Sequence, residues 1–343
     1  MTAICGQSGT GASGQPDALL PDALLIAGPT ASGKSALAME LAARLGGVVI
    51  NADSMQVYRE LRVLTARPTV ADEAAVPHAL YGVRAAAEAG SAAWWRGAAL
   101  AEMAAARAAG RLPILCGGTG MYFSSLTEGI APVPAISAEV REQARGFLAA
   151  EGPAAVHAAL SAVDPATAAR LQPEDGQRLA RAWEVWRQTG RGLASWQAEP
   201  GVPAPWRFTA IRLDPPREAL RAAIAGRFAA MLAEGALAEV RALVALGPDP
   251  ALPAMRAHGV PELAAHLRGE IGLEEAARRV ELATGQYTKR QATWLRHHQL
   301  APDSRLHMIH ARFAGLAQFS ERKMAEILSF LHGAGLTRCS VRP

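Results

Sequence analysis

The sequence predicts an α/β fold in which helices cover both faces of a parallel β-sheet. Short apolar segments alternate along the chain with longer helix-forming segments, a pattern typical of such a sheet. A glycine-rich loop joins the first apolar segment to the first helix-forming segment. Glycine or aspartate follows three of the strands, at the edge where open parallel sheets bind ligands. We therefore expect a ligand site at the carboxyl ends of the strands.

The apolar segments give the expected strands, and the alanine- and leucine-rich segments between them give the helices. We expect strands at Ala23–Ala27, Val48–Asn51, Ala79–Val83, Pro113–Cys116 and Arg207–Leu213. We expect helices at Lys34–Leu45, Ala92–Ala109 and Tyr122–Glu128, and a nearly all-helical chain from Asp214 to about Leu331.

Prolines and a change of pattern divide the chain. The strand pattern stops between residues 131 and 200, where about three helices are expected between Pro132 and a proline-rich run. We interpret residues 132–201 as a helical insertion into an α/β core formed by residues 22–131 and 202–331. Residues 1–21, rich in Gly and Ser, are expected to be a disordered leader, and residues 332–343 a tail.

The segment from Gly28 to Ser35 fits the phosphate-binding loop G-x-x-x-x-G-K-[ST], with a strand before it and a helix after it. This predicts a P-loop NTPase-like fold. Backbone N–H groups and Lys34 are expected to hold phosphate oxygens, and the Ser35 hydroxyl is placed to bind Mg²⁺. Kinases, ATPases, GTPases and some transferases share this loop, so it predicts a bound diphosphate or triphosphate but not the reaction. The expected phosphate-binding residues are Gly28, Pro29, Thr30, Ala31, Ser32, Gly33, Lys34 and Ser35.

Three further residues are candidates for chemistry. Asp53, after the second strand, suits a magnesium ligand, a group that positions a nucleophile, or a general base, but also an aspartate that caps the following turn. Thr119 lies in Gly117-Gly-Thr-Gly120 after the fourth strand, where its hydroxyl suits a phosphate contact or a helix cap. Arg227 lies on a helix with an apolar stripe. Its side chain is expected either to be solvated on the outer face of that helix or to stabilise phosphate charge.

Basic residues alternate with aromatic residues in two helical segments. One is Gln177-Arg-Leu-Ala-Arg181, close to Trp183 and Trp186, and the other is residues 286–298, which include Lys289 and Arg290. Such segments are typical of RNA binding through phosphate contacts and base stacking. An amphipathic helix whose tryptophan packs inward is the alternative for each segment.

The bulk composition limits the class of protein. The 343 residues carry a net charge of +4, which is compatible with a polyanionic partner. The three cysteines lack metal-ligand spacing, no apolar run is long enough to span a membrane, and the N-terminus lacks a signal-peptide pattern. We expect a cytoplasmic protein that does not contact the membrane.

Seven motifs together make the chain resemble the bacterial tRNA dimethylallyltransferase (tRNA isopentenyltransferase) family. The combination of this phosphate-binding loop with Ala-Asp-Ser-Met-Gln-Val-Tyr is highly specific, and the likeness runs from about Leu24 to Arg296. The matching segments are residues 28–35, 52–58, 65–68, 117–123, 177–181, 226–228 and 289–296.

The resemblance implies transfer of a dimethylallyl group from dimethylallyl diphosphate to the exocyclic amine of the adenosine 3′ of the anticodon, in tRNAs that read codons beginning with U. Asp53 would accept the amine proton, Thr119 and Arg227 would stabilise the departing diphosphate, and Mg²⁺ would bind with it. The partners would be a tRNA anticodon stem-loop and dimethylallyl diphosphate, and we expect a monomer. The expected tRNA-binding residues are Asp53, Ser54, Met55, Gln56, Arg141, Gln177, Arg178, Leu179, Ala180, Arg181, Arg256, Gly259, Lys289 and Arg290.

Three positions depart from the family pattern. Leu64 replaces a glycine, Val260 replaces a tyrosine, and Gly285 replaces an arginine, so a loop conformation and two tRNA contacts are in question. Two other functions remain as alternatives from the residues alone: a small-molecule or nucleotide kinase, and a regulatory nucleotide- or RNA-binding protein without turnover.

Overall fold

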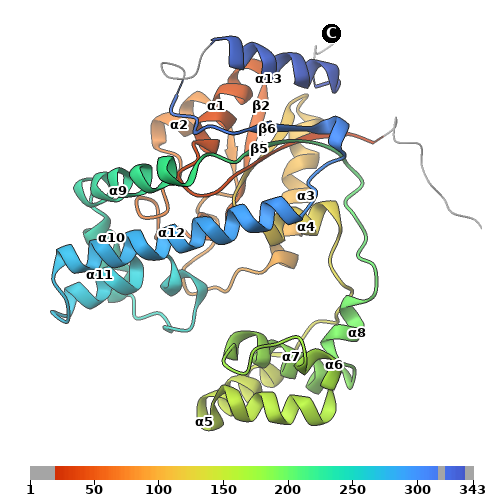
Figure 1. Cartoon of the computed structure of the whole chain (residues 1–343), viewed down its shortest axis with the longest axis vertical. Helices are drawn as coiled ribbons and strands as arrows, with labels where there is room; N and C mark the ends of the chain where they lie inside the picture. The colour runs from red at the N-terminus through yellow and green to blue at the C-terminus, as the bar shows by residue number, and fades with distance from the viewer. Residues whose placement is uncertain (1–19, 316–320, 337–343) are drawn as a thin grey trace, which may run out of the picture. The chain divides into compact units, whose positions relative to one another are not determined.

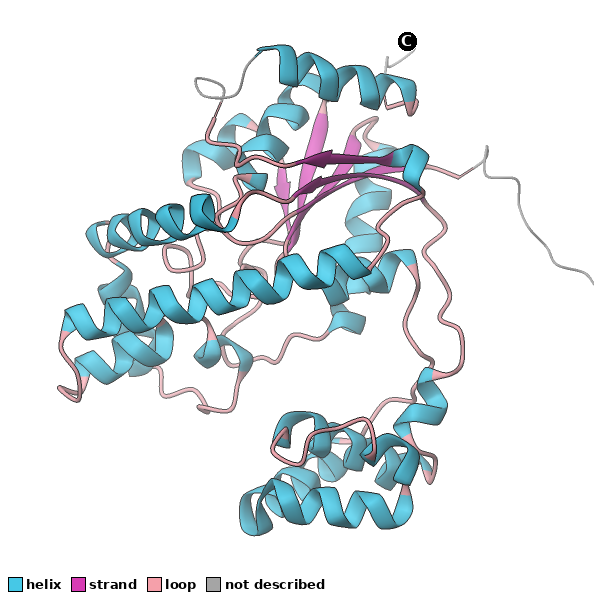
Figure 2. Ribbon diagram, in the orientation of Figure 1, coloured by secondary structure: helices cyan, strands magenta, loops and turns pink. Residues whose placement is uncertain are grey.

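The chain folds around a six-stranded, fully parallel sheet, which confirms the predicted α/β class (Figure 2). The structure, a computed structural model, describes residues 20–315 and 321–336. The strand order is β3-β2-β4-β1-β5-β6, with β1 and β4 at the centre. The strands are β1 (Asp22–Ala27), β2 (Gly47–Ala52), β3 (His78–Ala79), β4 (Leu112–Gly117), β5 (Arg207–Leu213) and β6 (Leu306–Ile309).

Two strands differ from the sequence expectation. The predicted strand at Ala79–Val83 is a two-residue strand, because Leu80 and Gly82 both have positive φ angles that turn the chain away from the sheet. Strand β6 was missed, since its four residues lie within a region that reads as helical. It pairs along its whole length with β5, from Ala210 opposite Leu306 to Leu213 opposite Ile309.

Alternation along the strands places apolar side chains on both faces of the sheet. Leu24 and Ile26 of β1 share one core with helix α1 (Lys34–Leu45) and helix α13 (Glu321–Gly333). Helix α3 (Ala92–Ala108) lies against β2 and β4, and its fully buried Trp95 donates a hydrogen bond to the carbonyl of Asn51. With both faces covered, ligands reach the sheet at the ends of its strands.

A second group of helices follows β5 (Figure 1). Helix α12 is 25 residues long, contacts both α9 and α11, and carries buried side chains along one stripe. These helices share an apolar core with the segment of the chain around Tyr58 and Leu61. The group consists of α9 (Arg217–Ala233), α10 (Ala236–Ala245), α11 (Val260–Leu267) and α12 (Leu273–His297).

Residues Ser124–Ala204 form a separate compact unit, and the predicted insertion at 132–201 lies inside this range. Within it, α5 bends at Gly152, whose φ of 78° breaks the helical conformation before Pro153. Leu179, Val156 and Leu160 are fully buried in its small apolar core. The unit contains α5 (Ala138–Val163), α6 (Pro165–Ala168), α7 (Gly176–Thr189) and α8 (Leu193–Gln197), and α4 (Gly120–Thr127) crosses its first boundary.

Helix α2 (Val70–Ala75) begins with a capping box between Thr69 and Asp72. None of the helices in the described ranges is long and apolar enough to cross a membrane. The predicted leader lies outside the described residues except for residues 20 and 21, and the predicted tail is described only as far as residue 336.

Candidate active site

A cavity of about 710 Å³ opens at the carboxyl ends of the strands, within the larger compact unit. Its volume is in the range of small-molecule sites. The phosphate-binding loop forms one wall, the segments at residues 53–56 and 62–70 form a second, and α9 and α12 contribute a third. The predicted location at this edge of the sheet thus coincides with a real cavity.

The phosphate-binding loop has the compact shape that its glycines predict. Gly33 lies in the left-handed region with φ of 87°, and a Cβ there would lie 1.7 Å from the carbonyl oxygen of Phe313. Gly28 donates a backbone hydrogen bond to the carbonyl of Gly117, which ties the loop to the end of β4. Of the eight predicted loop residues, those that line the cavity are Thr30, Ala31, Gly33, Lys34 and Ser35.

Lys34 is a buried cation at the floor of the cavity. Burial lowers the pKa of its ammonium group, and the nearby carboxylate of Asp53 opposes that shift. Its Nζ donates to the carbonyl of Pro29 at 3.5 Å, a long contact that leaves its charge poorly compensated. A bound anion would supply the missing compensation.

Asp53 is held in a tight local turn. Its backbone N–H donates to Oδ1 of Asn51 at 2.8 Å, and its own Oδ1 accepts the N–H of Met55 at 2.9 Å. The capping alternative is therefore correct for one carboxylate oxygen. Asp53 lines the cavity, and its charge acts on Lys34, Arg227 and Tyr287, so the carboxylate also belongs to the site.

Thr119 does not line the cavity itself, but it contacts Ser54, the sequence neighbour of the cavity-lining Asp53. Its Oγ1 accepts the backbone N–H of Ser54 at 2.9 Å and donates to Oγ of Ser54 at 3.3 Å. It also interacts with the hydroxyl of Tyr287 on α12, whose pKa is raised by burial and lowered by this interaction. Thr119 therefore connects the end of β4 to the segment that carries Asp53.

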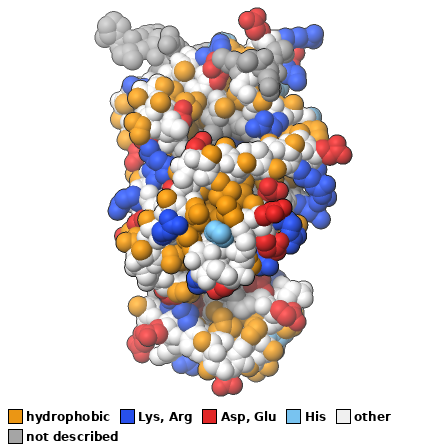
Figure 3. Space-filling view, turned by 90° about the vertical axis from the view of Figure 1, so that its left-hand side faces the viewer, with side chains coloured by type: hydrophobic (Ala, Val, Ile, Leu, Met, Phe, Trp, Pro, Cys, Tyr) orange, Lys and Arg blue, Asp and Glu red, His pale blue; other side chains and the backbone are white. Residues whose placement is uncertain are grey.

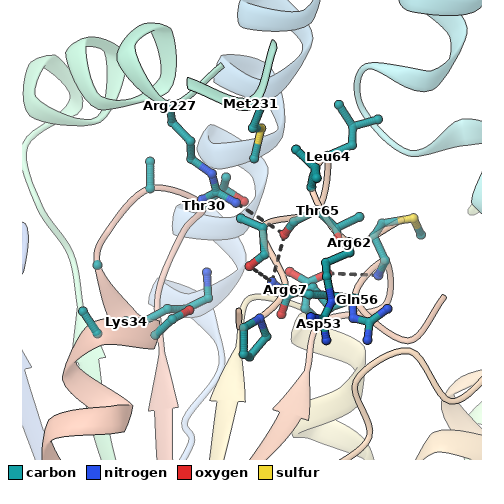
Figure 4. A pocket seen from close by; sticks show the side chains of 18 of the residues that line it. Thr30, Lys34, Asp53, Gln56, Arg62, Leu64, Thr65, Arg67, Arg227 and Met231 are labelled. Carbon is teal, nitrogen blue, oxygen red and sulfur yellow. Dashed lines mark hydrogen bonds between the residues drawn. The ribbon is translucent and has the colours of Figure 1, made fainter. Parts of the chain in front are cut away.

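Arg227 extends from α9 into the cavity, where Figure 4 shows it and Lys34 directed toward the same space. This settles its position in favour of the site over a solvated face. Its Nη2 donates to the carbonyl of Thr65 at 3.4 Å. Burial lowers the pKa of the guanidinium, Asp53 raises it, and the neighbouring Arg312 lowers it further.

The wall opposite the phosphate-binding loop is partly apolar, and an extended loop forms it. Leu64 lines the cavity together with Phe228 and Met231 of α9. The loop is held from outside by Glu239 of α10, whose carboxylate accepts the backbone N–H groups of residues 62, 63 and 64 at 2.7–2.9 Å. The side-chain amide of Gln56 donates to the carbonyls of residues 65 and 66.

The residues present fit a magnesium ion bound mainly through phosphate oxygens. Ser35 lines the cavity at the start of α1, and its hydroxyl interacts with the buried thiol of Cys116, whose pKa is raised by burial and lowered by this interaction. No group of three or more His, Cys, Asp or Glu residues suited to a metal occurs in the described ranges. Mg²⁺ is commonly held by one or two protein oxygens plus substrate phosphates and water, and Ser35 supplies one such oxygen.

The predicted tRNA-binding residues of the larger unit fall into two environments. Lys289 and Arg290 are exposed on α12 and line a shallow groove that also contains Trp294. Arg256 is exposed, whereas Gly259 is buried and begins α11 with φ of 101°. On the face drawn in Figure 3, basic and acidic side chains both surround a central hydrophobic area, so its charge is mixed.

In the smaller unit, the structure narrows the prediction. Leu179 and Ala180 are buried, so these two side chains are structural, which corrects their assignment as tRNA contacts. Arg141 and Gln177 are exposed, as are Arg178, which pairs with Asp175, and Arg181, which pairs with Glu184. Trp183 stacks on Trp186 and touches Phe147, as the alternative of an inward-packing tryptophan predicts.

The three departures from the family pattern have structural descriptions. Leu64 packs against Gly259, where a Cβ would lie 2.7 Å from a Leu64 methyl carbon. Val260 is fully buried in the core of the helical group. A Cβ at Gly285 would meet nothing within 4 Å, so this position of α12 is open.

The structure adds residues that the sequence did not single out. Gln291 of α12 accepts the backbone N–H of Thr30 at 2.8 Å and donates to the carbonyl of Gly118 at 3.0 Å, which joins both glycine-rich loops. Tyr287 lies beside His258, with ring centroids 5.0 Å apart, and both line the cavity. Tyr287 and Gln291 lie in the basic and aromatic segment 286–298, whose pattern predicted RNA binding but not contacts in this cavity. His258 lies in an irregular segment between two helices, without such a pattern.

Comparison with known proteins gives a consistent result. The sequence profile described as IPP transferase matches residues 56–298, and one described as isopentenyl transferase matches residues 21–78. A tRNA dimethylallyltransferase of Acidiphilium cryptum is 61% identical over 310 residues, which cover 90% of this chain and 94% of the relative. A protein of the same name from Rhodospirillum rubrum is 56% identical over 319 residues, which cover 92% and 96%.

Solved structures agree with these sequence relatives. A tRNA isopentenylpyrophosphate transferase from Bacillus halodurans has a TM-score of 0.64 and 30% identity, covering 91% of this chain and 96% of that chain. A eukaryotic dimethylallyltransferase acting on tRNA has a TM-score of 0.77 and covers 92% of this chain and 80% of that chain. Its identity is 24%, so this second likeness concerns the fold alone.

Proposed function

Because the chain belongs to the IPP transferase family, as its motifs predicted, we propose that it is a tRNA dimethylallyltransferase that uses dimethylallyl diphosphate as donor. The acceptor is the exocyclic amine of the adenosine 3′ of the anticodon in tRNAs that read codons beginning with U. The enzyme works as a monomer in the cytoplasm. The tRNA substrate is supported by the names of the sequence relatives and by the name of the 30% identical Bacillus halodurans structure, a tRNA isopentenylpyrophosphate transferase.

One observation carries the proposal: a single cavity holds the carboxylate of Asp53 and the cations Lys34 and Arg227. In the reaction, the bond between the allylic carbon and the bridging oxygen breaks, and the adenine nitrogen forms a bond to that carbon. The electron pair of the broken bond leaves on diphosphate, and the amine proton passes to Asp53. An exocyclic amine is a weak nucleophile, so the cavity lowers the barrier chiefly by stabilising the leaving group.

The leaving group is stabilised by the backbone and side chains of the phosphate-binding loop. Lys34 and Arg227 are both desolvated by burial. Their electrostatic attraction for a bound anion is therefore stronger than it would be in water. Mg²⁺, when bound, neutralises further diphosphate charge, and Ser35 is the residue that would hold it. The apolar wall of Leu64, Phe228 and Met231 suits the five-carbon group.

The target base must leave the anticodon-loop stack to reach Asp53. Tyr287 and His258 present aromatic rings in the cavity, where a purine can stack. Burial lowers the pKa of His258, so its ring is largely neutral near pH 7 and suits a neutral base. Exposed basic residues on α7 and α12 are the proposed contacts to tRNA phosphates.

The kinase alternative has no support from the relatives, which are named as prenyltransferases. A kinase would also pass the terminal phosphoryl group to a hydroxyl acceptor. The cavity instead places a carboxylate beside a mixed apolar and aromatic wall.

The proposal is tested by incubating the protein with Mg²⁺, dimethylallyl diphosphate and an anticodon stem-loop that carries adenosine 3′ of the anticodon. Nucleoside mass analysis should show one added five-carbon unit on adenosine. A separate assay of diphosphate should show one diphosphate released per transfer. A matched stem-loop with guanosine at that position is the control and should remain unmodified. Consumption of ATP without any prenylated nucleoside would instead favour the kinase.

A further inference from the structure

The segment that follows β6 is fastened to the phosphate-binding loop by two hydrogen bonds. The backbone N–H of Phe313 donates to the carbonyl of Ser32 at 2.9 Å. Nε of Arg312 donates to the carbonyl of Ala31, also at 2.9 Å. Phe313 is buried in the core beneath α1 and α13, so the segment is anchored on its inner side.

Arg312 has its guanidinium at the cavity. Its side chain is exposed to solvent and lines the cavity together with Ala31 and Lys34. The bond to Ala31 uses Nε, and no acceptor for the two Nη groups is found in the described ranges. A guanidinium that lines a cavity, is fixed at Nε and has no acceptor at its Nη groups within the described ranges is suited to a phosphate group.

Arg312 shares the cavity with the other charged residues of the site. Arg227 interacts with both the carboxylate of Asp53 and the guanidinium of Arg312, and all three residues line the cavity. Three cations, Lys34, Arg227 and Arg312, therefore gather around the phosphate-binding loop, and their mutual repulsion is relieved when a polyanion binds.

We propose that Arg312 binds the terminal phosphate of the prenyl diphosphate, as a third cation beside Lys34 and Arg227. The proposal rests on the proposed function, in which the allylic carbon must be next to the adenine and hence close to Asp53. The phosphate-binding loop then holds the diphosphate, and Arg312, whose Nε is bonded to the carbonyl of Ala31 in that loop, is available to the outer phosphate. Arg312 thus holds diphosphate both before the transfer and as product.

The test compares two ligands on the full chain by calorimetry: inorganic diphosphate with Mg²⁺, and dimethylallyl monophosphate, which lacks the terminal phosphate. Arg312→Gln should weaken diphosphate binding by about 10- to 100-fold, the loss expected for one charge-assisted contact. Binding of the monophosphate should change by less than about twofold. Arg322→Gln, at an exposed arginine of α13 paired with Glu326, is the matched control and should change neither affinity.

A second variant separates charge from support of the loop. Arg312→Lys keeps the positive charge and should give a diphosphate affinity between those of the parent and Arg312→Gln. Equal weakening of both ligands by Arg312→Gln would overturn the proposal, because it would show that the bond to Ala31 merely shapes the loop. Unchanged diphosphate binding would overturn it as well.

The proposed function is tested separately from the role of Arg312. If the parent binds diphosphate but forms no prenylated adenosine, the proposed transfer is contradicted, and the Arg312→Gln comparison still decides the role of Arg312.

Discussion

Asp53 shows how one side chain meets a local and a chemical demand together. Its Oδ1 closes a turn by accepting the N–H of Met55, which fixes the carboxyl group relative to the backbone. Its Oδ2 accepts no hydrogen bond within the described ranges. The turn therefore orients the second oxygen without consuming it, and a general base requires that arrangement.

We expect Asp53→Asn to lower the single-turnover rate by about 100- to 10,000-fold, because the amide cannot accept the proton. The amide oxygen can still accept the N–H of Met55, so the turn and the affinity for the stem-loop should persist. Asp249→Asn is the matched control, since its Oδ1 accepts the N–H of Ala251 in a turn of the same kind. A variant that kept most of its rate, or lost stem-loop binding, would contradict the assignment of Asp53 as base.

Tyr287 is a second residue whose contribution can be isolated. Tyr287→Phe keeps the ring beside His258 but removes the buried hydroxyl, which interacts with Thr119 and Gln291. We expect the transfer rate to fall by about 5- to 30-fold, equivalent to a buried hydrogen bond of about 1–2 kcal/mol.

The pH dependence of the same variant gives an independent check. Burial, and then the charge of Asp53, raise the pKa of Tyr287 to about 12, so its hydroxyl stays protonated at pH values where an ordinary tyrosine ionises. The ratio of parent to variant rates should therefore be constant from about pH 7 to about pH 10. A ratio that changed near pH 10 would show that Tyr287 ionises like an exposed tyrosine.

At this scale the sequence predicts residues that belong to contiguous motifs. The loop at residues 28–35 and Asp53 follow strands directly, so their position at the edge of the sheet could be predicted. Arg227 could not be placed, because a helix turns its side chains through all directions and only the packing of α9 decides which one meets the cavity. Gln291 and Arg312 arrive from chain segments about 260 and 280 residues away from the loop. Gln291 belongs to a segment that predicted RNA binding, and neither residue has a local pattern that predicts contact with the phosphate-binding loop.

Among the elements, the loop between β2 and α2 is shaped by contacts from outside itself. Three successive N–H groups point at the carboxylate of Glu239, and Ala66 has a positive φ of 49°. Leu64 takes the place of a glycine without needing such a φ, so the loop keeps a well-defined conformation despite this departure. The loop is thus a wall of the cavity that α10 holds in place.

Glu239→Ala should lower the free energy of unfolding by about 1–3 kcal/mol, because it leaves half-buried N–H groups without their acceptor. It should also raise KM for dimethylallyl diphosphate, since Thr65 and Leu64 lose their support. Urea denaturation and steady-state kinetics measure the two effects. Glu218→Ala in the first turn of α9 is the control and should stay within about 0.5 kcal/mol of the parent. A stable Glu239→Ala protein with unchanged KM would show that the loop keeps its shape without α10.

Element prediction succeeded where packing and periodicity agree. Helix α1 and strand β5 have the predicted bounds, because each is a continuous run of one type between clear breaks. Strand β6 was missed because four residues, one of them His307, carry no periodic signal, and only pairing with β5 makes them a strand. Strand β3 is shorter than predicted, because the turn geometry at Leu80, which has a positive φ, overrides the β-propensity of the segment.

At the scale of the whole molecule, the chain separates the chemistry from part of the proposed tRNA recognition. The cavity lies entirely in the larger unit, whereas Arg178 and Arg181 belong to the smaller one. Prolines and the loss of the strand pattern predicted an insertion at residues 132–201, and this range lies within the smaller unit. The burial of Leu179 could not, because a five-residue motif does not show which face of α7 packs inward.

The double variant Arg178→Gln/Arg181→Gln should weaken stem-loop binding by several-fold and reduce the slope of log affinity against log salt by about 1 for each phosphate that the protein no longer neutralises. KM for dimethylallyl diphosphate should not change, since both residues lie outside the cavity. Affinities measured at several salt concentrations test this, with Arg170→Gln, at another exposed arginine of the same unit, as control. An unchanged salt slope would exclude these two arginines as phosphate contacts.

Gln291 has a consequence that reaches beyond its two hydrogen bonds. The amide group of Gln291 bonds to both Thr30 and Gly118, so this single side chain fixes the distance between the two glycine-rich turns. Gly118 has no side chain to push that amide away, and a Cβ there would lie 2.2 Å from Nε2. The space between these turns, where the diphosphate would bind, is therefore fixed by the folded protein before substrate binds.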